Sequence, residues 1–345
     1  MKKIIIPVLI VFCAAMSSCT AMKRQAVVKV PETVDEQKEA EKNAEDHYNK
    51  GRFEDSVGVL LALLKKDPEN PVYWSQLGSA YAQLSAYNFS VEAYKKAIEL
   101  DPADVKARYN LSVVHSEYGS SAEAMKTVRD ALKISPRDPM LQASYGNVLI
   151  DQNRLEPAKQ VYSQIARAKP DFDVAHFNLG VINYKERNLD EAEKNYENVL
   201  KINPRDYEAK QNLAAIKILN GDFETAVKYL KDVVASNPAD DIVLSNAYFN
   251  MGIAYLRLNK HRDALKAFET VISIEPWDMA AYVNAAIISE HLGMKDKAAN
   301  YWQRYNRLLP VNKRKEEIKR RMEGMGKKFN EGGKPDGAQE GKGKK

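Results

Sequence analysis

Eight prolines recur at a nearly constant interval along the chain. Pro68, Pro102, Pro136, Pro170, Pro204 and Pro238 are each 34 residues apart, Pro276 follows after 38, and Pro310 after 34 again. Proline stops an α-helix because its ring fixes φ and its nitrogen carries no hydrogen. Regularly spaced helix stops indicate one supersecondary unit repeated many times. We therefore expect one array of repeats, rather than the two or three separate domains that 345 residues would otherwise suggest.

Small residues recur in the same register as the prolines. One column holds glycine, another holds alanine, and a third places glycine where a turn would need positive φ. The three columns are Gly78, Gly146, Gly180 and Gly252; Ala124, Ala158, Ala192, Ala226, Ala264 and Ala298; and Gly51, Gly119, Gly221 and Gly293. Larger apolar residues such as Leu77 and Tyr94 fill the columns between them. Each repeat is therefore predicted to be a helix, a turn and a second helix that ends at the proline.

These columns resemble the tetratricopeptide repeat (TPR). Trp74, Leu77, Gly78, Tyr81, Ala97 and Pro102 match its motif within one repeat. The resemblance covers residues 37–310 and implies an all-α solenoid of about eight helix-turn-helix repeats that form a right-handed superhelix. The repeats are expected to start near Gln37, Pro71, Val105, Pro139, Asp173, Tyr207, Ser245 and Met279. The four-residue excess before Ser245 must lengthen a helix or a loop.

The N-terminus has the features of a lipoprotein signal peptide. Lys2 and Lys3 precede a thirteen-residue uncharged run, Ile4 to Met16, which is too short to span a membrane but suits a signal-peptide core. The segment Met16-Ser17-Ser18-Cys19 resembles the bacterial lipobox, which implies cleavage before Cys19 and lipidation of that residue. Ordinary cleavage nearby, for example after Ala21, and an uncleaved anchor are the alternatives. Lipidation would place the protein in the bacterial cell envelope, and the absence of Asp after Cys19 weakly favours the outer membrane, on its periplasmic side.

The remaining segments flank the repeats. Residues 1–19 are predicted to be the signal peptide, residues 20–36 a linker, and residues 311–325 a charged capping helix with Ile318 and Met322 on one face. Residues 326–345 are rich in Gly and Lys and are expected to be disordered. From Val311 onward there are 12 Lys+Arg against six Asp+Glu, so the net charge of +5 comes from this end of the chain. A solvated tail is the plain interpretation, and binding to an anionic polymer is the alternative, although no nucleic acid is expected in a periplasmic setting.

The sequence contains no recognised catalytic motif. There is no glycine-rich phosphate loop, no His-Glu-x-x-His and no Gly-x-Ser-x-Gly. The five histidines, His47, His115, His176, His261 and His291, fall in different repeats. We therefore expect a protein that is not an enzyme and that has no cofactor and no metal site.

The first helix of each repeat is predicted to line a concave groove. The TPR resemblance assigns the second, fifth, sixth, ninth and twelfth positions of each repeat to this face. The candidate peptide-binding residues are Tyr109, Asn110, Val113, Phe177, Asn178, Val181, Tyr184, Asn212, Phe249, Asn250, Ile253 and Asn284. In one interpretation apolar side chains accept a partner's side chains, while the asparagines hold its backbone, similar to the ladder of O-GlcNAc transferases. In the other, the same residues simply pack between neighbouring helices.

A lipid anchor followed by repeats suggests an interaction scaffold. The leading hypothesis is a non-catalytic protein–protein interaction scaffold that faces the periplasm and assists assembly or recruitment of an envelope complex. In plan the chain resembles the lipidated TPR pilotins of type IV pili, which implies a secretin partner. An adaptor that presents substrates to a peptidoglycan enzyme is the other specific possibility.

Overall fold

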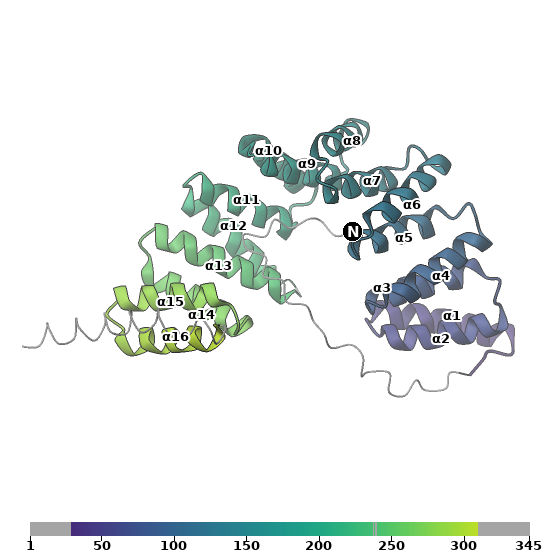
Figure 1. Ribbon diagram of the computed structural model, residues 1–345, viewed down its shortest axis with the longest axis horizontal. Coiled ribbons are helices and arrows are strands. Elements are labelled where there is room, and N and C mark those ends of the chain that lie inside the picture. The colour runs from purple at the N-terminus through teal and green to yellow at the C-terminus, as the bar shows by residue number, and fades with distance from the viewer. Residues whose placement is uncertain (1–28, 237, 239, 310–345) are drawn as a thin grey trace, which may run out of the picture. The chain divides into compact units, whose positions relative to one another are not determined.

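The computed structural model describes residues 29–309, apart from residues 237 and 239. Within these residues the protein forms sixteen α-helices and no strand, which confirms the all-α TPR fold (Figure 1). The chain divides into two compact units at Ile202 and Asn203, and each unit is considered by itself below.

Ten helices build the first unit. They are α1 (Val34–Asn49), α2 (Phe53–Lys66), α3 (Pro71–Gln83), α4 (Tyr87–Leu100), α5 (Val105–Glu117), α6 (Ser121–Ile134), α7 (Pro139–Asp151), α8 (Leu155–Ala168), α9 (Asp173–Lys185) and α10 (Leu189–Ile202). The second unit contains α11 (Tyr207–Leu219), α12 (Phe223–Ala235), α13 (Asp241–Arg257), α14 (His261–Ile274), α15 (Met279–His291) and α16 (Lys295–Leu308).

Each turn inside a repeat contains one residue with a left-handed backbone. The predicted turn glycines, Gly51, Gly119, Gly221 and Gly293, have φ between +71° and +81°. In the other four repeats the equivalent position is occupied by Ser85, Asn153, Arg187 and Asn259, with φ between +56° and +65°. Only glycine adopts this conformation without steric cost, so these four turns are held by the packing of the helices around them.

Aspartate or asparagine starts most of the first helices. The carboxylate oxygens of Asp104, Asp206 and Asp278 each accept a hydrogen bond of 2.8 Å from the backbone N–H three residues later. Asp138 and Asp240 bond the N–H two residues later, also at 2.8 Å. These side chains satisfy backbone donors that the first helical turn leaves without partners. The proline that ends one helix is thus followed by a cap that starts the next.

Glycine in the first helix makes room for an aromatic ring of the second helix. A Cβ added at Gly78, Gly146, Gly180 or Gly252 would lie 2.6 to 2.9 Å from the ring of the residue 16 positions later, which is Tyr94, Tyr162, Tyr196 or Phe268. Where the first helix has Ala44, Ser112 or Ala214, the later residue is the smaller Leu60, Val128 or Leu230. Side-chain volume is therefore balanced within each of these repeats, as a close-packed interior requires. The pair Ala286 and Trp302 departs from this rule.

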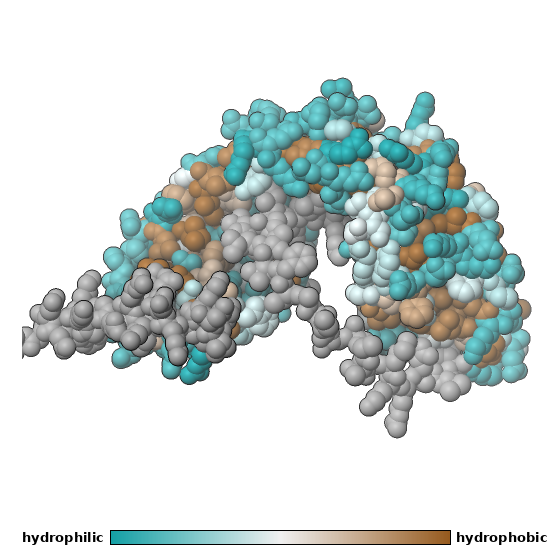
Figure 2. Space-filling view, viewed as in Figure 1, coloured by the Kyte–Doolittle hydropathy of each residue, from teal (hydrophilic) through white to brown (hydrophobic). Residues whose placement is uncertain are grey.

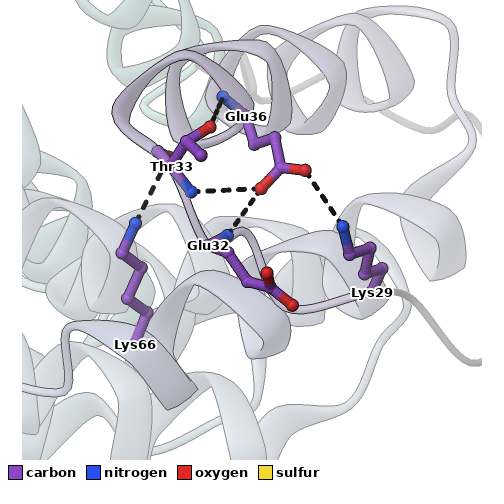
Figure 3. Close-up of polar contacts among 5 residues, drawn as sticks. All are labelled: Lys29, Glu32, Thr33, Glu36 and Lys66. Atoms are coloured by element: carbon purple, nitrogen blue, oxygen red, sulfur yellow. Dashed lines mark hydrogen bonds and ion pairs between the residues drawn. The ribbon is translucent and has the colours of Figure 1, made fainter.

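The first helix begins earlier than expected. We predicted a linker to residue 36 and a repeat from Gln37, but α1 begins at Val34, after the N-cap Thr33. Thr33 and Glu36 form a capping box: Thr33 Oγ1 accepts from the Glu36 N–H at 3.2 Å, and the Glu36 carboxylate accepts from the Thr33 N–H at 3.1 Å. Figure 3 shows Lys66 reaching the Thr33 carbonyl oxygen from α2, which ties this cap to the second helix.

The four-residue excess lengthens a helix. Helix α13 has 17 residues, whereas the first helices of repeats two to six have 13. It begins at Asp241, still in the 34-residue register, instead of near Ser245 as expected. Four residues make slightly more than one helical turn, so the extension keeps nearly the same face towards the neighbouring helices.

Within each unit, apolar cores join neighbouring helix pairs. In the first unit, one core spans α1 to α4, another spans α4 and α5, and a third runs from α6 to α9. In the second unit, a core around Phe268 and Val271 joins α14 to α15, and residues of α13 pack against it. Figure 2 shows patches of hydrophobic residues among largely hydrophilic ones on the face that it draws.

Several predictions lie outside the described residues. These are the signal peptide with Cys19, most of the linker, the helix at 311–325 and the tail at 326–345. Among the residues that are described, no helix has the length and apolar character needed to cross a bilayer.

Candidate functional site

All twelve predicted groove residues lie on first helices. In the first unit, α5 carries Tyr109, Asn110 and Val113, and α9 carries Phe177, Asn178, Val181 and Tyr184. In the second unit, α11 carries Asn212, α13 carries Phe249, Asn250 and Ile253, and α15 carries Asn284.

The centre of α9 is closed to a partner. Phe177 and Val181 are both 0% exposed, and the Phe177 ring packs edge-on against Tyr196 with 5.5 Å between ring centroids. A fully buried side chain cannot contact a partner unless the helices separate. For these two residues the packing alternative holds, and they are not part of an accessible groove.

Two asparagines of the predicted groove bond the backbone of their own helix. Asn178 and Asn284 donate through Nδ2 to the carbonyl oxygens of Val174 and Ala280, four residues back, at 3.0 and 2.9 Å. The Tyr94 hydroxyl lies 2.8 Å from Ser79 Oγ. Burial raises the pKa of Tyr94 to about 12, so the hydroxyl stays protonated and bonded.

Burial further limits the ladder interpretation. Asn178, Asn212 and Asn250 are at most 8% exposed, whereas Asn110 and Asn284 are partly exposed. Only Asn110 and Asn284 could therefore offer accessible amides to an extended peptide, and Asn284 already donates to the Ala280 carbonyl oxygen.

Partly exposed apolar side chains remain on four first helices. We call these residues the first-helix surface. In the first unit it consists of Tyr109, Val113 and Tyr184, and in the second unit of Phe249, Ile253 and Ile287. Ile287 is the most open at 45% exposure. Phe249 rests edge-on against Phe268, with 5.3 Å between centroids, so its ring is held in place while part of it stays accessible. Fixed aromatic and aliphatic side chains of this kind suit the docking of apolar groups.

Several large apolar side chains are exposed at positions outside the predicted groove. Trp277 is 61% exposed in the loop before α15, Ile242 is 62% exposed in the first turn of α13, and Phe89 is 58% exposed on α4. The Phe89 ring lies 5.3 Å from that of Tyr81. None of these positions belongs to the predicted groove.

A serine and a histidine meet a common tyrosine in the first unit. The Tyr87 hydroxyl lies 3.0 Å from His115 Nδ1 and 3.2 Å from Ser120 Oγ. Burial lowers the pKa of His115, which keeps the imidazole neutral and ties it to the packing of α4 against α5. Tyr87 stands between the two groups, so this arrangement braces the helices and does not place the histidine as a base for the serine.

A pocket of about 530 Å³ lies between α14 and α16. Its lining residues are Glu269, Ile272, Asp296, Lys297, Asn300, Tyr301 and Arg304. Glu269 Oε1 accepts from the Tyr301 hydroxyl at 2.6 Å and from Lys297 Nζ at 3.1 Å. Burial, together with Glu269, raises the pKa of Tyr301, so the hydroxyl acts as a donor to the carboxylate. Within the described part of the chain, no group of three or more His, Cys, Asp or Glu side chains converges.

Sequence comparison identifies the repeat. Models of the tetratricopeptide repeat match residues 42–88, 80–119, 146–207, 183–246 and 245–278. A curated relative is the peroxisomal targeting signal receptor of Candida glabrata, 26% identical over 150 residues. The match covers 38% of this chain and 25% of the receptor, so this chain spans about a quarter of the relative's length.

Solved structures share the fold. A tetratricopeptide repeat protein from Parabacteroides merdae has a TM-score of 0.56 at 17% identity, covering 73% of this chain and 98% of that one. Pseudomonas aeruginosa PilF has a TM-score of 0.54 at 18% identity, covering 66% of this chain and 99% of that one. Together with the helix pairs and their 34-residue register, these matches show that the chain is built of tetratricopeptide repeats.

Proposed function

We propose that this protein is a non-catalytic interaction scaffold, anchored by lipid at Cys19 and facing the periplasm, which assists assembly or recruitment of an envelope complex. TPR proteins mediate protein–protein interactions. The observation that carries the proposal for this chain is the first-helix surface, where anchored side chains such as Phe249 and Ile287 remain open to a partner.

The start of the folded body fits an anchored chain. Thr33 caps α1, and Lys66 holds that cap from α2, so folded structure is established 14 positions after Cys19. A connection of that length spans at most about 50 Å. Several acyl chains on Cys19 would give stable attachment, because each buried CH₂ contributes about 0.8 kcal/mol. The repeats would then act close to the membrane surface.

The polar groups of the described residues support a role without catalysis. His115 is held by Tyr87, and Glu269 by Lys297 and Tyr301, so each of these titratable groups is occupied in joining helices. A reaction in this system would then come from a partner protein, with the repeats presenting its substrate.

A pilotin for a type IV pilus secretin is the first specific alternative. It rests on the shared plan of a lipobox and repeats, while the 18% identity with PilF concerns the fold alone. An adaptor for a peptidoglycan enzyme is the second. Deleting the gene separates them: loss of secretin multimers supports the pilotin, and unchanged multimers with altered peptidoglycan processing support the adaptor.

Labelling and capture test the main proposal. A palmitate analogue should label the wild-type chain and fail to label Cys19→Ala, and membrane fractionation should show the variant released from the outer membrane. Cross-linked pull-down from intact envelopes should then recover an envelope protein with the wild type. Persistent labelling of Cys19→Ala would refute the lipid anchor.

A further inference from the structure

Two histidines from different repeats lie side by side in the second unit. His261 is the first residue of α14 and His291 is the last residue of α15. Their ring centroids are 4.3 Å apart, with the ring planes tilted by 55°. His261 is partly exposed and His291 is exposed, so solvent reaches the pair. The packing of α14 against α15 brings together residues that are 30 positions apart in the chain.

The other three histidines have partners in the fold, and His47 Nδ1 lies 3.8 Å from an Asp55 carboxylate oxygen. His176 lies 2.9 Å from the Pro170 carbonyl oxygen and His115 lies 3.0 Å from the Tyr87 hydroxyl. His261 and His291 have no such hydrogen bond among the described residues, and their contact is with each other. Their ring nitrogens are therefore available to a ligand.

The spacing of the rings suits two ligands of one metal ion. With metal–nitrogen distances of about 2.1 Å, two imidazoles at a right angle have ring centres about 4.6 Å apart, and at a tetrahedral angle about 5.3 Å. The observed 4.3 Å is shorter than these values by 1 Å or less. Small side-chain rotations close this difference, and the exposure of His291 leaves room for them.

The donor set selects the kind of metal. Neutral imidazole suits Zn²⁺, Cu²⁺ and Ni²⁺, whereas Ca²⁺ and Mg²⁺ require oxygen ligands. No third His, Cys, Asp or Glu joins the pair within the described residues. A metal held here would keep open coordination positions, which water or a side chain of a partner protein can fill.

We propose that His261 and His291 form a two-imidazole binding site for a late first-row divalent metal ion. The site lies on helices α14 and α15 and is independent of the scaffold proposal. Binding weakens as the pH falls, because a protonated imidazole has no lone pair for the metal.

Zinc titration tests the site directly. The probe is ZnCl₂ added to the full chain, without an affinity tag and with Cys13→Ser and Cys19→Ser so that thiols do not contribute, followed by calorimetry and by NMR of the imidazole nitrogens. We expect saturable binding, with shifts in the signals of both histidines. His261→Gln or His291→Gln should weaken binding by roughly tenfold or more, since losing even an outer partner of a metal ligand costs about 10–100-fold.

Control experiments make the result decisive. His176→Gln removes a histidine of the first unit and should leave zinc affinity unchanged, and CaCl₂ should produce no imidazole shifts. Circular dichroism of each variant confirms that the helices are retained. The proposal is overturned if zinc shifts neither histidine at millimolar concentration, or if both single variants bind zinc like the parent chain.

Discussion

The ring of Tyr162 occupies the space that a side chain at position 146 would need. A Cβ built on Gly146 would lie 2.6 Å from Tyr162 Cε2, and the Tyr162 hydroxyl is fixed by hydrogen bonds to the Ala143 carbonyl at 2.8 Å and to Asn147 Oδ1 at 2.6 Å. The ring therefore cannot move aside easily. The repeat signature of a small residue followed 16 positions later by a ring is a direct consequence of this contact.

Gly146→Ala is predicted to destabilise the first unit by about 1–3 kcal/mol, because overpacking outweighs the better helix propensity of alanine. In a Tyr162→Leu background the same change should cost much less, as the natural pair Ala214 and Leu230 suggests. Urea denaturation of the four proteins in the cycle measures the coupling. Equal costs of Gly146→Ala in both backgrounds would contradict this packing account.

Arg187→Gly is predicted to stabilise the protein by about 1 kcal/mol. Arg187 has φ of +65°, a conformation that costs a non-glycine residue about 1–2 kcal/mol. Gly221 occupies the equivalent turn of the next repeat with nothing within 4 Å of its Cβ position, so Gly221→Ala serves as the converse control and should destabilise. Thermal unfolding of both variants measures the effect. A change of melting temperature in the same direction for both would contradict a cost of the left-handed conformation at these turns.

The cap of α1 should show a distinct pH dependence. The pKa of Glu36 is lowered from 4.5 to about 2, first by the Glu32 N–H and then by Lys29 and the Thr33 N–H. A lowered pKa in the folded state means that this stabilisation is complete above about pH 4.5 and is lost as the pH falls towards 2. NMR titration of the Glu36 carboxyl and hydrogen exchange of α1 should report this window.

Substituting Glu36 distinguishes the pH dependence of the α1 cap from the effect of protonating other carboxylates on the protein. Glu36→Gln should remove the pH-dependent protection of α1 between pH 4.5 and 2, while Glu39→Gln on the same helix should leave it in place. Thr33→Ala should weaken α1 by about 1 kcal/mol at neutral pH. A Glu36 titration near 4.5 would show that the capping box does not form.

Two alanine substitutions should distinguish a first-helix residue that packs in the core from one that binds a partner. Phe177→Ala removes a fully buried ring that contacts Tyr196, and it should cost about 3–5 kcal/mol. Ile287→Ala removes a side chain that is 45% exposed, so stability should change by no more than about 0.5 kcal/mol while partner capture weakens. Denaturation and pull-down of both variants test this, and an Ile287→Ala protein that captures its partner normally would remove α15 from the interaction surface.

The repeat fold could be predicted from the sequence because the residues that shape each repeat recur at a fixed interval. Proline stops, capping aspartates and the Gly–ring contact all act within one repeat, so each leaves a periodic mark, and the predicted starts at Pro71, Val105, Pro139, Asp173, Tyr207 and Met279 agree with the helices. Helix α1 begins three residues before Gln37, because Thr33 and Glu36 form a capping box, and α13 begins four residues before Ser245, because the extra residues extend that helix. The left-handed turn at Arg187 could be found only from its place in the register, since arginine itself gives no such signal.

The interaction surface could be predicted only in part. Position in the repeat places Phe177 and Ile253 on equivalent faces, yet the first is fully buried and the second remains partly exposed. Burial depends on the sizes of the side chains that neighbouring helices contribute. The position of a residue within its repeat does not specify those sizes. The His261–His291 contact was missed for the same reason, because it joins two repeats.

Site-resolved cross-linking tests the central claim, that the first helices bind a partner protein, most directly. A photoreactive amino acid at Tyr109 of α5 or Ile287 of α15 should yield a partner adduct in intact envelopes. The same amino acid at exposed Lys126 of α6 or Lys266 of α14, both on second helices, should not. Adducts at Tyr109 and Ile287 alone would agree with the scaffold account. Equal adducts at all four positions, or adducts only at Lys126 and Lys266, would contradict it.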